Sequence, residues 1–67
     1  NVYPNPTNGK VNISGDFDFV NVHSSTGRLL LESTSNLIDL SYYDSGIYLI
    51  SVQKGDRIYR TRIVKEN

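Results

Sequence analysis

Cysteine, methionine and tryptophan are absent from this chain, and it contains no long hydrophobic run. Without cysteine it can form no disulfide, and no thiolate can act as a nucleophile or metal ligand. No apolar segment approaches the roughly 20 residues that a membrane-spanning helix needs. The only histidine, His23, stands beside serines in a chain with little room for a cleft, which does not favour a catalytic triad. The sequence therefore predicts no enzyme, no metal site and no cofactor.

Charge and length narrow the remaining classes of function. Seven basic and seven acidic residues leave a formal net charge of zero, and nucleic-acid binding needs a concentrated surplus of Lys and Arg. We therefore expect no nucleic-acid partner, and we expect some self-association because a net charge near zero gives little colloidal protection. A single domain of 67 residues buries only about 60% of its unfolded surface, so its stability should be marginal. No N-terminal signal peptide is visible, so we expect a piece of a longer protein.

The opening segment combines two prolines with an Asn-Gly turn signal and an alternating stretch. Pro4 and Pro6 fix φ and lack a backbone N–H, so this segment cannot begin as a helix or as a central strand. Gly9 is expected to supply a turn position with positive φ. Residues 10–14 then alternate polar and apolar side chains, as a half-buried strand does. We predict an extended edge segment, a tight turn and a first core strand.

The rest of the chain shows short extended stretches separated by turn residues, and no helical period. The expected strands lie within residues 16–23, 28–32, 37–40, 46–52 and 57–65. Residues 42–45 are compatible with a helical turn or a loop, whereas residues 46–52 are apolar enough to be the central strand. Strands at intervals of about 8–12 residues with turns between them are typical of a sandwich. The sequence predicts an all-β fold, a small immunoglobulin-like antiparallel β-sandwich.

Several motifs in order resemble the C-terminal sorting domain of the type IX (Por) secretion system, type A family. They are Tyr3–Gly9 (YPNPTNG), Val20–Arg28, the block from Asp39–Ser41 to Ser45–Val52, and the basic finish Arg62–Lys65. Each motif is weak alone, but together they span nearly the whole chain at the spacing of the family. The chain departs from the family pattern in two places. The family often has an acidic residue where His23-Ser24-Ser25 stands, and many members stop at a lysine, whereas this chain continues with Glu66 and Asn67.

The resemblance implies a non-catalytic signal domain, residues 1–67, excised from a larger secreted protein. It implies recognition by outer-membrane components of the secretion system, which export the preceding cargo domain through the periplasm of a Gram-negative bacterium. In attached members a sortase-like peptidase cuts upstream of the domain and joins the cargo to the cell surface; other cargo is released. Two alternatives remain: a secreted carbohydrate- or protein-binding module using Tyr42 and Tyr43, and a structural cap that keeps the preceding domain soluble.

The candidate recognition and motif residues are Pro4, Asn5, Pro6, Gly9, Gly27, Gly46, Tyr48, Arg60, Arg62 and Lys65. The segment from Pro4 to Pro6 either contacts the machinery or only holds the chain along a sheet edge and protects that edge from aggregation. Gly9 and Gly27 are expected to permit turns.

The later candidates lie in the two strongest strands. Gly46 is expected to allow close packing or a bulge, and Tyr48 is expected to be a core ring whose hydroxyl reaches a backbone partner. The basic residues of the last strand are expected to form one stripe, either a solvated edge or a docking site for an acidic surface.

Overall fold

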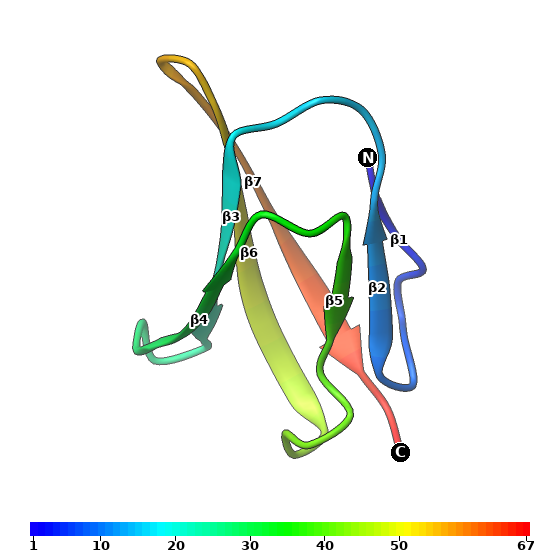
Figure 1. The fold of residues 1–67 in the computed structure, drawn as a ribbon. Helices are drawn as coiled ribbons and strands as arrows, with labels where there is room; N and C mark the ends of the chain where they lie inside the picture. The colour runs from blue at the N-terminus through cyan, green and yellow to red at the C-terminus, as the bar shows by residue number, and fades with distance from the viewer.

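Short alternating or apolar stretches, interrupted by turn residues, fold this chain into strands. The computed structural model describes all 67 residues and contains seven strands in two antiparallel sheets (Figure 1). The strands are β1 (Val2–Tyr3), β2 (Lys10–Ile13), β3 (Phe19–Ser24), β4 (Leu29–Ser33), β5 (Leu37–Asp39), β6 (Gly46–Lys54) and β7 (Arg57–Lys65). This confirms the expected all-β antiparallel sandwich. The structure holds no helix long and apolar enough to cross a membrane.

The two sheets differ in size. The smaller sheet has the order β1-β2-β5, and the larger has the order β4-β3-β6-β7. Strand β6 pairs with β3 on one side and with β7 on the other, so the stretch predicted to be central is central. The core face of β6 is buried, as at Ile50, whereas Ile47 on its outer face is 43% exposed. Residues 42–45 form a turn and loop, with Tyr43 N donating to Leu40 O at 3.0 Å.

The hairpin between β6 and β7 sets the register of the last strand. Lys54 pairs with Arg57, which leaves Gly55 and Asp56 as a two-residue turn, and Gly55 has φ of 59°. Gly55 N donates to the Asp18 carboxylate at 2.7 Å, so the turn is also held by the residue just before β3. From this turn the pairing runs without a shift to Gly46 and Lys65. The fixed register decides which β7 side chains face the core.

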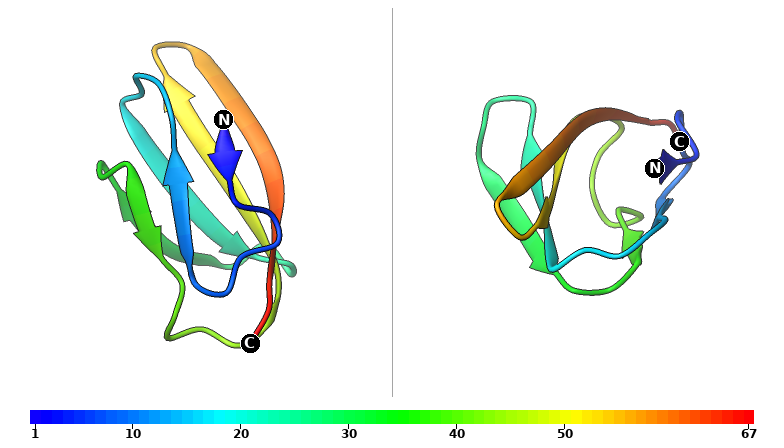
Figure 2. Two further views of the ribbon diagram at one scale, coloured as in Figure 1. Left: turned by 90° about the vertical axis from the view of Figure 1, so that its right-hand side faces the viewer. Right: turned by 90° about the horizontal axis from the view of Figure 1, so that it is seen from above.

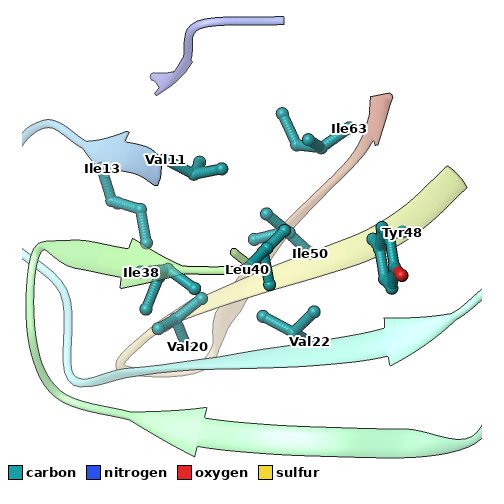
Figure 3. Packing of buried hydrophobic residues seen from close by; sticks show 9 residues of the cluster. All are labelled: Val11, Ile13, Val20, Val22, Ile38, Leu40, Tyr48, Ile50 and Ile63. Atoms are coloured by element: carbon teal, nitrogen blue, oxygen red, sulfur yellow. The ribbon is translucent and has the colours of Figure 1, made fainter. Parts of the chain in front are cut away.

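Alternate residues of the two sheets meet in a single apolar core (Figure 3). The nine buried residues of the core are Val11, Ile13, Val20, Val22, Ile38, Leu40, Tyr48, Ile50 and Ile63. Five strands and the residue that follows β5 supply them, and partly buried side chains such as Val2 and Phe17 pack against them. Because side chains alternate across a strand, the residues between them point out of the sandwich. These outward residues are the ones available for recognition.

Replacing a fully buried core residue should remove much of the stability of so small a domain. Ile50 has no exposed surface, and we expect Ile50→Ala to lower the free energy of unfolding by about 2–5 kcal/mol and Ile50→Val by about 0.5–1.5 kcal/mol. The control is Ile58→Ala, because Ile58 is 48% exposed. Urea unfolding followed by circular dichroism measures both, and equal losses for Ile50→Ala and Ile58→Ala would contradict this description of the core.

Candidate recognition surface

The side chain of Asn5 pairs with the edge of β7 as a neighbouring strand would. Its Nδ2 donates to Arg62 O at 2.8 Å, and its Oδ1 accepts from Val64 N at 3.0 Å. The peptide bonds before Pro4 and Pro6 are both cis. Figure 2 shows the blue N-terminal segment crossing the red end of β7. The segment between the prolines therefore lies along a sheet edge, and whether it also contacts the machinery stays a prediction.

Thr7 continues this pairing with its main chain. Thr7 N donates to Val64 O at 2.8 Å, and Glu66 N donates to Thr7 O at 2.7 Å. The Thr7 hydroxyl is buried: it donates to Lys10 O at 2.6 Å and accepts from Gly9 N at 3.1 Å. We call the contact of residues 4–7 with residues 62–66 the terminal seam. It satisfies the outward backbone groups at the end of β7 and leaves the edge near Ile58 and Arg60 unpaired.

The prediction for Gly9 is wrong in its reason, because Gly9 does not have a positive φ. A Cβ added at this position would lie 2.7 Å from Ser41 Oγ, which is closer than a side chain can come without a shift. Ser41 cannot move away freely, since its hydroxyl and its N–H both donate to the Asp39 carboxylate. These two hydrogen bonds, the side-chain one first, hold the pKa of Asp39 below its ordinary value. Gly9 is thus required by a tertiary contact.

The two later glycines differ from each other. Gly27 has φ of 91° in the turn between β3 and β4, which confirms that it permits a turn. Gly46 has φ of 151°, but open space surrounds the position of its missing Cβ and the β6–β7 pairing has no bulge there. The expectation of close packing or a bulge at Gly46 is therefore wrong, and its backbone angle is what favours glycine. The register shift of this sheet lies instead between Val22 and His23.

Tyr48 is a core residue with a bonded hydroxyl, as predicted. It is 7% exposed, and its hydroxyl donates to Asp44 O. Burial first, then the nearby Asp44 and Tyr43, raise the pKa of the Tyr48 phenol above its ordinary value. The Tyr43 ring lies against it, with centroids 6.1 Å apart and planes tilted by 59°. Tyr48 therefore fixes the loop before β6 to the core, and it offers nothing to a partner.

The basic stripe expected along β7 does not form as one surface. Arg60 and Arg62 are exposed on the outer face, whereas Lys65 is only 6% exposed and lies on the other face. The reason is the two-residue period of a strand, which places even and odd positions on opposite sides. Lys65 instead pairs with Gly46 and bridges to Thr7 within the terminal seam. The outer face keeps two basic residues.

These two arginines border a groove on the outer face of the larger sheet. Its floor and walls include Asn21 and His23 of β3 and Leu49 of β6, and its volume is about 630 Å³. The Asn21 Oδ1 atom is buried and accepts no hydrogen bond. A smaller hollow of about 420 Å³ lies next to Asn5, between the seam and the groove. Sequence reasoning missed Asn21, because only the registers of β3 against β6 and of β6 against β7 place it in the same groove as the arginines.

A comparison with known protein families covers both sides of the terminal seam. The sequence model of the secretion system C-terminal sorting domain matches residues 1–66, which includes both sides of the seam. The chain belongs to this family. A search of curated proteins finds no match.

The sorting domain is the C-terminal signal of type IX secretion cargo, and such a signal implies export to the cell surface or secretion. The resemblance of the sequence to this family is thus confirmed. In the structure the first motif and the last motif lie side by side, although Asn5 and Arg62 are 57 positions apart. The middle motifs build the core strands between them.

The aromatic pair considered for a carbohydrate-binding module is not a platform in the sorting domain. Tyr42 is 94% exposed, but Tyr43 packs against the core and against Tyr48. A stacking surface for a sugar needs neighbouring exposed rings, and of this pair only Tyr42 is exposed. The placement of these rings does not favour the alternative.

Loss of the Asn5 amide should loosen the seam. We expect Asn5→Ala to lower the free energy of unfolding by about 1–3 kcal/mol, because it removes two hydrogen bonds worth about 0.5–1.5 kcal/mol each. Asn8→Ala is the matched control, since Asn8 lies in the same segment and is exposed. Hydrogen exchange at Val64 N–H measures the local effect and urea unfolding the global one. Unchanged protection of Val64 N–H in Asn5→Ala would refute the pairing.

Tyr48 should make the sorting domain less stable at alkaline pH. Its pKa is raised in the folded state, so the unfolded chain loses this proton first, near pH 10. The contribution of the Tyr48 phenol to the free energy of unfolding is fully present below that pH and is lost as pH rises through the folded pKa. In Tyr48→Phe the alkaline loss of stability should be shallower, while stability at neutral pH falls by about 0.5–1.5 kcal/mol. Unfolding midpoints at neutral pH and above about pH 10 test this, and parallel pH profiles would contradict it.

Proposed function

We propose that outer-membrane components of the type IX secretion system recognise the folded sorting domain at its terminal seam. One observation carries this proposal: the Asn5 side chain pairs with the backbone of Arg62 and Val64. The opening and closing motifs of the family therefore form one surface. A partner that contacts both motifs together contacts a composite surface that neither peptide presents alone.

This arrangement makes the signal dependent on folding. In an unfolded chain the two motifs are separated by a flexible polypeptide, and bringing them together costs loop-closure entropy. In the folded domain the packing of the core already holds the two motifs together, so the seam is preorganised for binding. A partner that requires the seam would accept cargo whose terminal domain has folded and reject cargo whose terminal domain has not.

Exposed apolar side chains beside Asn5 supply contact area for such a partner. Ile47 and Val64 are a cross-strand pair on the outer face, and they are 43% and 40% exposed. They line the smaller hollow together with Asn5. Adjacent apolar side chains rimmed by polar groups are the usual composition of the centre of a protein interface.

In this proposal the domain catalyses no reaction. The hydroxyl of Ser24, the serine nearest to His23 in the chain, hydrogen bonds to Thr26 Oγ1 at 2.8 Å and also accepts from Arg28 N at 3.2 Å. His23 lies on the open outer face rather than in an enclosed pocket. Serine catalysis needs a histidine on the nucleophile and a carboxylate on the histidine, and this arrangement is not present.

We place the domain, residues 1–67, at the C-terminal end of a larger secreted protein, in the type A branch of the family. Its cargo passes through the periplasm of a Gram-negative bacterium, and a sortase-like peptidase cuts upstream of the domain. The cargo is then attached to the surface or released. The motif order and the family membership support these assignments.

An export assay with surface variants tests recognition at the seam. The domain is fused behind a fluorescent cargo in a host with the secretion system, and the fraction of fluorescence outside the outer membrane is measured. We expect the double variant Ile47→Thr/Val64→Thr to reduce export by about 10-fold, the result of losing about 1.4 kcal/mol of binding. Threonine keeps the β-branched shape, so the strand should persist.

The matched control is Leu29→Thr/Leu37→Thr, two leucines that are 55% and 44% exposed on other strands. Circular dichroism of each purified domain shows whether it is folded. Normal export of the Ile47/Val64 variant, or equal losses for both pairs, would refute recognition at the seam. Normal export after deletion of the whole domain would refute the sorting function.

A further inference from the structure

The outer groove of the larger sheet combines features that the packing of the domain does not use. Register pairs Arg62 with Leu49 and Leu49 with His23 in one row across the sheet, and Arg60 with Ser51 and Ser51 with Asn21 in the next. The two rows form the floor of the groove of about 630 Å³. The other face of these strands is filled by the core, so this face is free to meet a partner.

The side chains that line the groove carry a net positive charge, and Glu32 of β4 lies on the same face, one strand beyond β3, without lining the groove. Arg60 and Arg62 are its only Lys or Arg residues, and no carboxylate lines it. The single ion pair of the chain joins Lys54 Nζ to Asp16 Oδ2 at 3.9 Å, at the far end of the β6–β7 hairpin. Both guanidinium groups are therefore available for a carboxylate, which they can bind in a two-pronged geometry.

A second, independent feature lies in the same groove. The side-chain oxygen of Asn21 is buried and has no hydrogen-bond donor. Buried polar atoms in proteins almost always have a partner. A ligand in the groove that brings an N–H to this oxygen would satisfy it, and a peptide backbone or an amide side chain supplies such a donor.

The spacing of the arginines indicates the shape of the ligand. Arg60 and Arg62 stand two residues apart on one face of a strand, a separation of about 6.6 Å. Alternate side chains of an extended peptide have the same separation. We infer that the groove binds an extended acidic segment of a protein partner, with carboxylates at alternate positions on Arg60 and Arg62 and an N–H on Asn21.

This inference rests on the proposed function in one respect: the partner that carries the acidic segment would belong to the secretion machinery. The groove adjoins the seam through Arg62, whose carbonyl accepts from Asn5 while its side chain borders the groove. Peptide binding in solution tests the groove alone, whereas export tests the sorting function. The two can therefore fail separately.

The experiment measures binding of a fluorescein-labelled ten-residue peptide, with glutamate at every second position, to the 67-residue chain by fluorescence anisotropy. We expect the peptide to bind, and the matched peptide with glutamine at those positions to bind about 10-fold more weakly or not at all. Arg60→Gln/Arg62→Gln should weaken binding of the acidic peptide by about 10-fold. Affinity should fall as salt is added, because these charges are exposed.

The matched control is Arg28→Gln/Arg57→Gln, which removes the same net charge from exposed positions outside the groove. Asn21→Val should weaken binding while leaving the unfolding midpoint unchanged or higher, since it removes an unpaired buried oxygen. Equal effects of the two arginine pairs, equal affinity of both peptides, or no binding would overturn the proposal. Displacement of the peptide by inorganic phosphate at constant ionic strength would also overturn it, in favour of a small-anion site.

Discussion

The side-chain amide of Asn5 occupies the place of a peptide group in a neighbouring strand at the end of β7. One amide supplies both a donor and an acceptor, so it satisfies Arg62 O and Val64 N together. Thr7 then adds main-chain bonds to Val64 O and from Glu66 N. A chain without cysteine has no covalent closure, and this contact ties its two ends together by hydrogen bonds. Residues 4–7 lie between β1 and β2 of the small sheet, so the seam also connects that sheet to β7, the last strand of the large sheet.

The prolines on either side of Asn5 explain why a side chain, and not the main chain, pairs with β7 at this position. Pro4 and Pro6 have no N–H to give to a ladder, so the main chain of this segment cannot pair continuously with β7. Asn5 supplies the missing donor from its side chain, and regular pairing resumes at Thr7. An edge sealed in this manner resists pairing with a second chain over residues 62–66. The unsealed half, near Ile58, is where the self-association expected from zero net charge would begin.

The sequence predicted best where a pattern repeats and worst where distant segments meet. The long β6–β7 hairpin follows from its alternation and from the Gly55 turn, and the Tyr48 hydroxyl follows from its place in a buried strand. Gly9 looked like a local turn residue, but Ser41 requires it, and no local signal reports a contact between the paired ends of β2 and β5. The same limit hid Asn21, which lines the same groove as Arg60 only through the register of three strands. The position of Lys65 was different: its odd number, against Arg60 and Arg62, already placed it on the other face.

In the recognition that we propose, Arg62 would connect stability with binding. Its carbonyl is bonded in the seam and its side chain borders the groove, so a partner in the groove fixes the strand that Asn5 holds. A ligand that binds only the folded state stabilises that state by RT ln(1 + [L]/Kd). A small domain has little stability to spare, so this gain is a large fraction of the total. Binding at the groove and closure at the seam should therefore strengthen each other, because both depend on the same stretch of β7.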